Sequence, residues 1–378
     1  MNERIRGLDG LRAVAIVWVM LFHSWLVGGM GRWDWLATPG WMGVDLFFVL
    51  SGYLIASQVF AGIARGERFS YADFYTRRAF RILPAFLVVL ALYVAVPAIR
   101  EVHRLPPLWM FLTFTQNLFV DYSHDRAFSH AWSLCVEEHF YLVFPALAML
   151  LVRRIGGRGV AAIAIATVLA GIAWRGIVWT QWLAPLRSTS GGPSAFGARW
   201  VEWIYYPTWC RLDGLLFGVL LAAIRTWRPS WWTAIAARNG SIALGGLACL
   251  AAAVVVTTER DGLLASVAGF PLASFAMALL VAAGATANSW TSRLTPPGAG
   301  WVAAASYSLY LTHKATFAVV DGLLPEDMQG IARFALIGVA AVAIGALLHY
   351  VVERPGLRIR QRLQRARATS PAALPEAV

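Results

Sequence analysis

The sequence predicts an all-α integral membrane protein with about ten transmembrane helices. Of the 378 residues, 59% are hydrophobic and only 14% are charged, whereas roughly 25% of the residues of an ordinary soluble domain are charged. Mostly apolar stretches of about 18 or more residues recur along the whole chain, and each is long enough to cross ~30 Å of hydrocarbon. Basic residues gather in short clusters between these stretches, which is the pattern that orients membrane proteins.

Ten stretches are predicted to span the membrane. They cover residues 11–28, 41–63, 82–100, 137–152, 160–182, 205–224, 240–257, 267–286, 300–320 and 331–352. An eleventh apolar segment, 107–120, extends only roughly 21 Å at ~1.5 Å per residue, which is too short for a full crossing. It also contains four polar side chains, so we expect a re-entrant or interfacial segment there: Thr113, Thr115, Gln116 and Asn117.

The distribution of arginine favours ten crossings over eleven. With ten, the segments on the N-terminal side of the membrane carry twenty arginines and the opposite segments carry seven. A crossing by 107–120 would reverse the rest of the chain and place the basic tail outside, against the positive-inside rule. Both termini are therefore expected in the cytoplasm. Residues 1–355 form the predicted membrane domain, and residues 356–378 form a predicted disordered, basic tail.

Composition also bears on the partners of the chain. The net charge of +12 does not indicate a nucleic-acid partner, because the basic clusters follow the membrane topology and membrane lipids are the expected surroundings. The three cysteines have neither the spacing of a metal site nor that of a disulfide framework, and no metal is predicted. The bias towards Arg, Ala and Trp favours a GC-rich bacterial gene, and nothing in the sequence specifies an oligomeric state.

Ionisable groups inside apolar spans are costly, which makes them candidates for function. Arg12 lies near the cytoplasmic start of the first predicted helix and His23 near its outer end, ~16 Å further along the axis. The two side chains cannot touch, but they could bind opposite parts of one long ligand. His23 could take a proton from a hydroxyl group, and Asp45 in the next span could orient its imidazole. The alternative is a structural histidine that a neighbouring helix satisfies.

An arginine pair marks the inner end of the third predicted span. Arg78 and Arg81 are three residues apart and share one face of a helix. Guanidinium groups at this position suit the phosphates of coenzyme A. The alternative is ordinary anchoring by positive charge at the cytoplasmic boundary.

Two further groups are candidates for substrate binding. Four side chains precede or begin the fourth predicted span on the outer side, where they could line a glycan site: His130, Trp132, Ser133 and Glu137. Arg211 and Asp213 are two residues apart on a helix and do not face each other. Each is therefore expected to have its partner elsewhere in the fold.

Taken together, these motifs resemble the membrane-bound acyltransferase 3 family of bacterial cell-surface polysaccharide O-acyltransferases. They occur in order over nearly the whole chain. The motifs are Leu8-Asp9-Gly10-Leu11-Arg12-Ala13 with His23, Gly43-Val44-Asp45-Leu46-Phe47-Phe48 with Ser51-Gly52, Arg77-Arg78-x-x-Arg81-x-x-Pro84, Trp132-Ser133-Leu134-x-x-Glu137, Ser306-Tyr307-Ser308-Leu309-Tyr310-Leu311-x-His313 and Glu353-Arg354-Pro355.

The resemblance implies a ten-helix enzyme of the bacterial inner membrane that takes acyl-CoA, usually acetyl-CoA, as its donor co-substrate. The acyl group would pass to a sugar hydroxyl of a polysaccharide or lipid-linked oligosaccharide at the outer face. His23 would be the catalytic histidine, and Arg12, Arg78 and Arg81 would position coenzyme A. His139 departs from the family pattern, which has Gln at this position. The short tail after Arg354 indicates the type without a fused hydrolase-like domain.

Two other functions remain open from the sequence. A transporter or flippase of a lipid-linked glycan would line its pathway with the same charges, and it would not hydrolyse acetyl-CoA. A structural subunit of an export complex would keep its function when His23 is replaced by alanine.

Overall fold

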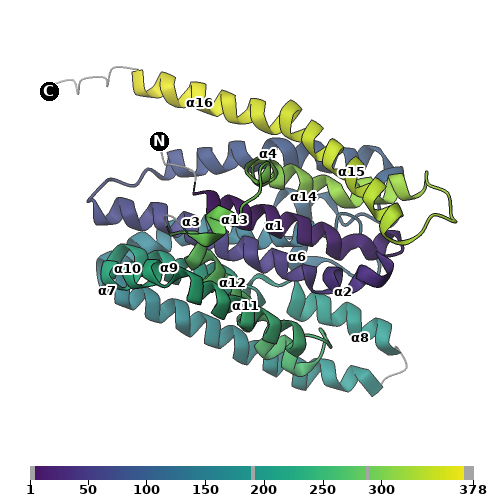
Figure 1. Ribbon diagram of the computed structural model, residues 1–378, viewed down its shortest axis with the longest axis horizontal. Helices are drawn as coiled ribbons and strands as arrows, with labels where there is room; N and C mark the ends of the chain where they lie inside the picture. The colour runs from purple at the N-terminus through teal and green to yellow at the C-terminus, as the bar shows by residue number, and fades with distance from the viewer. Residues whose placement is uncertain (1–4, 189–191, 287–288, 370–378) are drawn as a thin grey trace.

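The chain folds into a bundle of helices, shown in the computed structural model of Figure 1. The structure describes residues 5–188, 192–286 and 289–369, and every regular element within these ranges is helical. The α-helices are α1 Arg6–Phe22, α2 Asp34–Ala37, α3 Met42–Ala64, α4 Tyr71–Ala95, α5 Leu108–Leu112, α6 Gln116–Phe119, α7 Ala131–Val178, α8 Gly192–Trp200, α9 Asp213–Trp227, α10 Pro229–Ala237, α11 Asn239–Val256, α12 Phe270–Gly284, α13 Trp290–Leu294, α14 Ala299–Asp321, α15 Gly330–Leu348 and α16 Arg354–Thr369.

Short 3-10 and π-helical turns extend or connect these helices. They are η1 His23–Val27, η2 Gly31–Trp33, η3 Thr38–Trp41, η4 Pro97–Ile99, η5 Trp179–Leu183, η6 Ala184–Ser188, η7 Val201–Tyr205, η8 Thr208–Cys210, η9 Ala265–Gly269 and η10 His349–Glu353. In Figure 1, α1 begins and α16 ends at the same end of the bundle, on the left of the view. That arrangement agrees with the prediction that both ends of the chain lie on one side of the membrane.

Seven helical segments among the described residues are long and apolar enough to cross a membrane. They are Arg6–Val27, Gly31–Ala64, Tyr71–Ala95, Ala131–Arg187, Asn239–Val256, Ala265–Gly284 and Gly330–Gln364. The predicted spans 205–224 and 300–320 fall on α9 and α14, which are absent from this set. α9 has only 15 residues, and α14 carries His313 and Lys314. An all-helical, multi-pass membrane architecture is therefore confirmed, while ten crossings stay a prediction.

A single glycine divides α7, the longest helix. Gly156 has φ 66° and ψ −178°, a conformation that is open essentially to glycine alone. The predicted spans 137–152 and 160–182 fall on the two sides of this break. The sequence predicts a connecting loop between them, but in the structure the backbone is helical up to Gly156 and again after it.

The outer surface of the bundle is apolar. Val255 of α11 and Val339 of α15 are 73% and 70% exposed, and many other large aliphatic side chains are exposed with them. A continuous apolar surface of this kind would be unfavourable in water. It suits a bilayer, because lipid tails are as apolar as the side chains.

α3 lies at the centre of the bundle and packs closely on α9. A Cβ atom at Gly52 of α3 would overlap the backbone of Leu215 in α9, and one at Gly218 of α9 would overlap the backbone of Val49 in α3. Small residues allow this approach of two backbones, as is common between membrane helices. The close packing therefore holds α3, which lines the first cavity described below, against α9.

The segment 107–120 does not form one continuous helix. It contains the short helices α5 and α6, separated by a turn in which Phe114 has φ 54°. Asn117 is buried, and its side-chain amide donates hydrogen bonds to the Tyr206 carbonyl oxygen (3.1 Å) and to Thr208 Oγ1 (2.9 Å). These two contacts satisfy the amide nitrogen of Asn117, whereas its Oδ1 atom and both amide atoms of Gln116 are buried without a hydrogen-bond partner in the described part of the chain.

The prediction of a disordered tail from residue 356 is wrong for residues 356–369, which belong to α16. This helix packs on α4: Gly356 lies against Pro84, and Gln364 Nε2 donates a hydrogen bond to Asp73 Oδ1 at 2.7 Å. Contacts with a distant helix therefore order a segment whose local composition is typical of disorder. The remainder of the predicted tail, residues 370–378, lies outside the described residues.

Candidate active site

A cavity lined by arginines lies between α1, α3, α4, α7 and α14, and we call it the arginine cavity. Its volume is about 300 Å³. α1 contributes Arg12, α4 contributes Arg78 and Arg81, and α7 contributes Glu137 and Glu138. The structure therefore brings together the three arginines that are predicted from the sequence to position the donor.

Local helix structure selects which arginines of α4 reach this cavity. Ser70 caps the helix by accepting a hydrogen bond from the backbone N–H of Asp73 at 3.2 Å. Asp73 then forms an ion pair with Arg77, one turn further along. Arg78 and Arg81 lie on the face that lines the cavity, because residues three apart share a side of an α-helix.

The three arginines of this cavity are available to a ligand. Within the described ranges, no hydrogen bond or ion pair to the guanidinium groups of Arg12, Arg78 or Arg81 is present. The guanidinium carbon of Arg78 lies 4.9 Å from the ring centroid of Tyr141. Glu137 accepts hydrogen bonds from Ser51 at 2.7 Å and from Tyr141 at 3.1 Å. Unpaired guanidinium groups favour a multiply charged anion, and their planar geometry matches phosphate oxygens.

A second cavity, which we call the histidine cavity, has a volume of about 440 Å³. His23 enters it from the end of α1, His130 from the residue before α7, and Lys314 from α14. Much of the remaining wall is aromatic: Phe22, Trp25, Trp41, Tyr122, Trp132, Tyr205 and Tyr206. Flat aromatic surfaces of this kind suit sugar rings.

Two histidines contact each other beside this cavity. His23 Nδ1 lies 3.0 Å from the Val19 carbonyl oxygen and 3.1 Å from Nε2 of His313. His313 Nδ1 lies 2.8 Å from the Tyr310 carbonyl oxygen. A carbonyl oxygen can only accept, so the hydrogen-bond network assigns a hydrogen to Nδ1 of each ring. His313 Nε2 is then an acceptor for His23, and His23 Nε2 keeps a lone pair with which it can act as a base.

A buried ion pair between Lys314 and Glu101 lies next to these imidazoles. Lys314 Nζ lies 2.9 Å from Glu101 Oε1 and donates to Ser129 Oγ at 2.6 Å. Tyr93 donates a hydrogen bond to the other carboxylate oxygen of Glu101 at 3.1 Å. Buried charges need such partners. The pair also joins α14 to the chain segments that follow α4.

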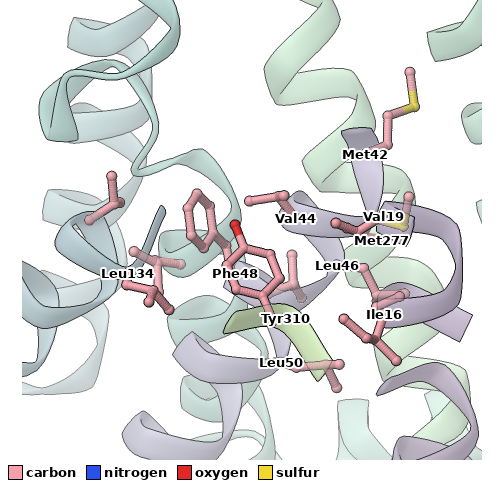
Figure 2. Close-up of a cluster of buried hydrophobic side chains, with 14 of the residues drawn as sticks. Ile16, Val19, Met42, Val44, Leu46, Phe48, Leu50, Leu134, Met277 and Tyr310 are labelled. Carbon is pink, nitrogen blue, oxygen red and sulfur yellow. The ribbon is translucent and has the colours of Figure 1, made fainter. Parts of the chain in front are cut away.

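The two cavities meet at Val44 and Tyr310, which line both of them. Figure 2 shows these two side chains close to Phe48 and Leu134, within a cluster of buried apolar residues. The Tyr310 hydroxyl donates a hydrogen bond to the His130 carbonyl oxygen at 2.9 Å. An elongated ligand could therefore have its anionic end at the arginines and its other end near His23.

The proposed contact between Asp45 and His23 is wrong, because the structure gives Asp45 a different partner. Asp45 Oδ1 lies 2.9 Å from Arg211 Nη2 and 3.4 Å from Ser274 Oγ. All of these groups are buried. The hydrogen-bond partner of His23 on another helix is His313, which belongs to the motif of residues 306–313 and for which the sequence predicts no role of its own.

Arg211 and Asp213 were predicted to bind substrate and to have separate partners. The separate partners are confirmed: Arg211 pairs with Asp45, while Asp213 pairs with Arg175 at 2.8 Å. Neither residue is among those that line the two cavities. Their geometry therefore accounts for both as buried structural ion pairs between helices.

The predicted glycan-binding group is divided between the two cavities. His130 and Trp132 line the histidine cavity, whereas Ser133 and Glu137 line the arginine cavity. The helical turn of α7 turns successive side chains in different directions. His139, the departure from the family pattern, contacts Thr208 Oγ1 at 2.7 Å and lines neither cavity.

Several site residues carried weak signals in the sequence. Lys314 is the only lysine of the chain, and it follows His313 in the quoted motif, so both could have been singled out. Glu101, Arg126 and Arg260 lie in connecting segments without a recognisable pattern. Only the fold brings these three to the histidine cavity.

The fold and the site describe a helical membrane protein in which a cavity lined by arginines adjoins a cavity lined by histidines. The chain belongs to the acyltransferase 3 family: residues 5–350 match the family described as "Acyltransferase domain". The membrane domain is therefore an acyltransferase domain, and the resemblance seen in the motifs is confirmed.

The curated relatives include the O-acetyltransferase OatA of Staphylococcus aureus. OatA from strain NCTC 8325 / PS 47 and OatA from strain COL are each 27% identical to this chain over 332 residues. The matched region covers 81% of this chain and 49% of OatA. The chain thus spans about half the length of these relatives. No solved structure matches the chain significantly.

Proposed function

We propose that this protein transfers an acetyl group from acetyl-CoA to a hydroxyl group of a cell-surface or exported polysaccharide. The observation that carries the proposal is the junction of two chemically different cavities at Val44 and Tyr310. The arginine cavity offers three unpaired guanidinium groups to the phosphates of coenzyme A. The histidine cavity offers a base and aromatic walls to a sugar. The name of the relative OatA, an O-acetyltransferase, supports the same chemistry.

In the proposed reaction, His23 Nε2 removes the proton of the acceptor hydroxyl. The hydroxyl oxygen attacks the thioester carbonyl carbon, the carbon–sulfur bond breaks, and the thiolate of coenzyme A leaves and takes up a proton. General base catalysis of this kind contributes about 10²–10⁴-fold to a rate. His313 accepts the Nδ1–H of His23 and holds the ring so that Nε2 faces the acceptor. A variant in which Nε2 first takes the acetyl group itself uses the same two histidines.

The proposal includes an orientation in the membrane. The arginine cavity opens towards the cytoplasm, the histidine cavity faces the opposite side of the bacterial inner membrane, and ten helices cross it with both termini in the cytoplasm. The excess of arginines on the predicted inner side supports this topology. The shared end of the bundle at which α1 begins and α16 ends agrees with it (Figure 1).

The direct test measures release of coenzyme A and transfer of labelled acetyl by the full chain in proteoliposomes. We expect His23→Ala to lower turnover of acetyl-CoA by about 10²-fold or more, because it removes the base. Arg78→Ala should mainly raise the KM for acetyl-CoA. His124→Ala is the matched control, since His124 is an exposed histidine paired with Asp121. Wild-type turnover in the His23→Ala variant would rule out the proposed base.

A cellular experiment tests the acceptor class. In a deletion strain, the O-acetyl content of surface polysaccharide should return with the wild-type gene and not with His23→Ala at equal membrane levels. If O-acetylation is independent of the gene while glycan export depends on it, the protein is a flippase and the proposal fails.

A further inference from the structure

Two arginines of the histidine cavity lack a carboxylate partner. Arg126 and Arg260 both line this cavity, and within the described residues neither forms an ion pair or a hydrogen bond. Arg126 lies over one aromatic ring instead, and Arg260 lies over three. The guanidinium carbon of Arg126 lies 5.7 Å from the Tyr122 ring centroid, and that of Arg260 lies 5.2 Å from the Phe22 ring centroid.

The carboxylates around these arginines are engaged with other cations. The carboxylates of the nearby chain segments form four ion pairs with other residues: Glu101 with Lys314, Asp121 with His124, Asp125 with Arg104, and Glu202 with Arg199. Glu259 and Asp261 flank Arg260 in the chain, but neither lies within ion-pairing distance of it in the described structure. The histidine cavity therefore carries two uncompensated positive charges.

The two guanidinium groups both influence the ionisation of one residue of the cavity wall, Tyr122. Burial raises the pKa of Tyr122 above its ordinary value, and the positive charges of Arg126 and Arg260 both oppose that rise. Arg260 is also close to the reacting imidazole, because the Phe22 ring on which it lies has its centroid 5.1 Å from that of His23. An anion held by these arginines would lie within the reach of a sugar whose hydroxyl contacts His23.

We propose that the acceptor is an acidic saccharide, whose carboxylate or phosphate binds Arg126 and Arg260 and so places a nearby hydroxyl at His23. This inference rests on the proposed function, since it names the class of acceptor for the same site. Charge-assisted hydrogen bonds to the two guanidinium groups supply the selectivity. The stacked aromatic rings hold each guanidinium group in place while leaving its N–H donors free.

The test compares saccharides that differ only in charge. Binding of fluorescently labelled oligogalacturonate to the full chain in nanodiscs is measured by anisotropy, next to the same oligomer with every carboxylate methyl-esterified. A phosphorylated malto-oligosaccharide and its unphosphorylated parent form the second pair, and the two pairs separate a carboxylate source from a phosphate source. We expect at least one acidic member to bind about tenfold more tightly than its neutral partner. The preference should fall as salt is raised.

Variants assign the preference to the two arginines. Arg126→Gln and Arg260→Gln should each reduce the acidic-to-neutral preference at least threefold. Arg32→Gln should retain it, because Arg32 also lies on an aromatic ring, that of Trp33, but lines neither cavity. Equal binding of acidic and neutral forms, no binding of either, or a preference that survives both arginine variants would overturn the inference.

Turnover of acetyl-CoA, measured beside the binding assay, distinguishes failure of the proposed function from failure of this inference. His23→Ala should keep the acidic preference in the binding assay while it loses turnover of acetyl-CoA. A wild-type protein that binds acidic saccharides selectively but never releases coenzyme A would contradict the acetyl transfer and leave the anion site in place.

Discussion

His23 and His313 form a pair of imidazoles whose hydrogen positions follow from backbone carbonyl groups. Each Nδ1 lies next to a carbonyl oxygen, that of Val19 for His23 and that of Tyr310 for His313. The acceptor nitrogen of His313 therefore stands where a carboxylate stands in a triad. A neutral acceptor orients the first ring without bringing another negative charge into a membrane protein, where an unpaired charge is costly.

We expect His313→Ala to lower the turnover of acetyl-CoA by roughly tenfold to a hundredfold, because His23 loses the acceptor that orients its ring. His313→Gln should keep more of the rate, since the amide oxygen can accept the same hydrogen bond. The dependence of kcat on pH, measured for both variants in proteoliposomes, distinguishes a positioning role from simple loss of structure. Identical pH profiles and rates for wild type and His313→Ala would contradict this role.

Asp45→Asn should affect the stability of the protein more than its turnover, in contrast to His313→Ala. It leaves Arg211 buried without its ionised partner, and breaking a buried pair from one side costs about 3–5 kcal/mol. The thermal midpoint of the purified protein should therefore fall, whereas the turnover of the folded fraction should fall much less than in His313→Ala. A loss of turnover at an unchanged thermal midpoint would restore Asp45 to the catalytic group.

At the scale of elements, the close packing of α3 on α9 depends on glycine. A Cβ atom at Gly52 would overlap the Leu215 backbone, which cannot rotate away. Gly52→Ala should therefore destabilise the protein by about 1–3 kcal/mol, the usual cost of overpacking. Denaturation in mixed micelles measures the effect.

Gly245→Ala is the matched control for this prediction. Gly245 lies in α11, and an added Cβ atom would meet no heavy atom within 4 Å apart from its chain neighbours and the nearby backbone of its own helix. The same substitution should leave stability unchanged or raise it by up to about 1 kcal/mol, because alanine favours the helix. Equal destabilisation by both substitutions would show that the contact between α3 and α9 is not the cause.

Most helices could be predicted from the sequence because apolar length is a local property. The predicted spans 11–28 and 41–63 fall on α1 with η1 and on η3 with α3. α16 could not be predicted in this way, since it is ordered by α4, nearly three hundred positions away, through contacts such as that of Gln364 with Asp73. The break at Gly156 was missed because a conformation with positive φ needs only one residue and no loop.

The whole molecule combines local motifs into a site that the sequence predicted only in part. Arg12, Arg78 and Arg81 share one cavity as expected. Charged side chains are costly in an apolar bundle, so the sequence predicted that either a common ligand or the membrane boundary explains their positions. The partner of His23 was predicted wrongly. Depth along a helix can be estimated from residue number, but the direction in which a side chain points depends on the rotation of each helix in the bundle.

The boundary formed by Val44 and Tyr310 has a consequence for the energy metabolism of the cell. A bacterial inner membrane stores a proton gradient, and two water-accessible cavities joined end to end would discharge it. On the proposed orientation, in which the two cavities open to opposite sides of such a membrane, the apolar cluster of Figure 2 has to keep this junction dry, as hydrophobic constrictions do in channels.

We expect the double variant Val44→Gly, Tyr310→Ala to make proteoliposomes several-fold more permeable to protons, because it opens the junction to water. A pH-sensitive dye inside the vesicles reports the collapse of an imposed gradient. Val339→Ala, on the exposed surface of α15, should stay as tight as the wild type. If the double variant is equally tight, other residues provide the seal. On the proposed function, acetyl transfer through such a junction exports a chemical group without exporting charge.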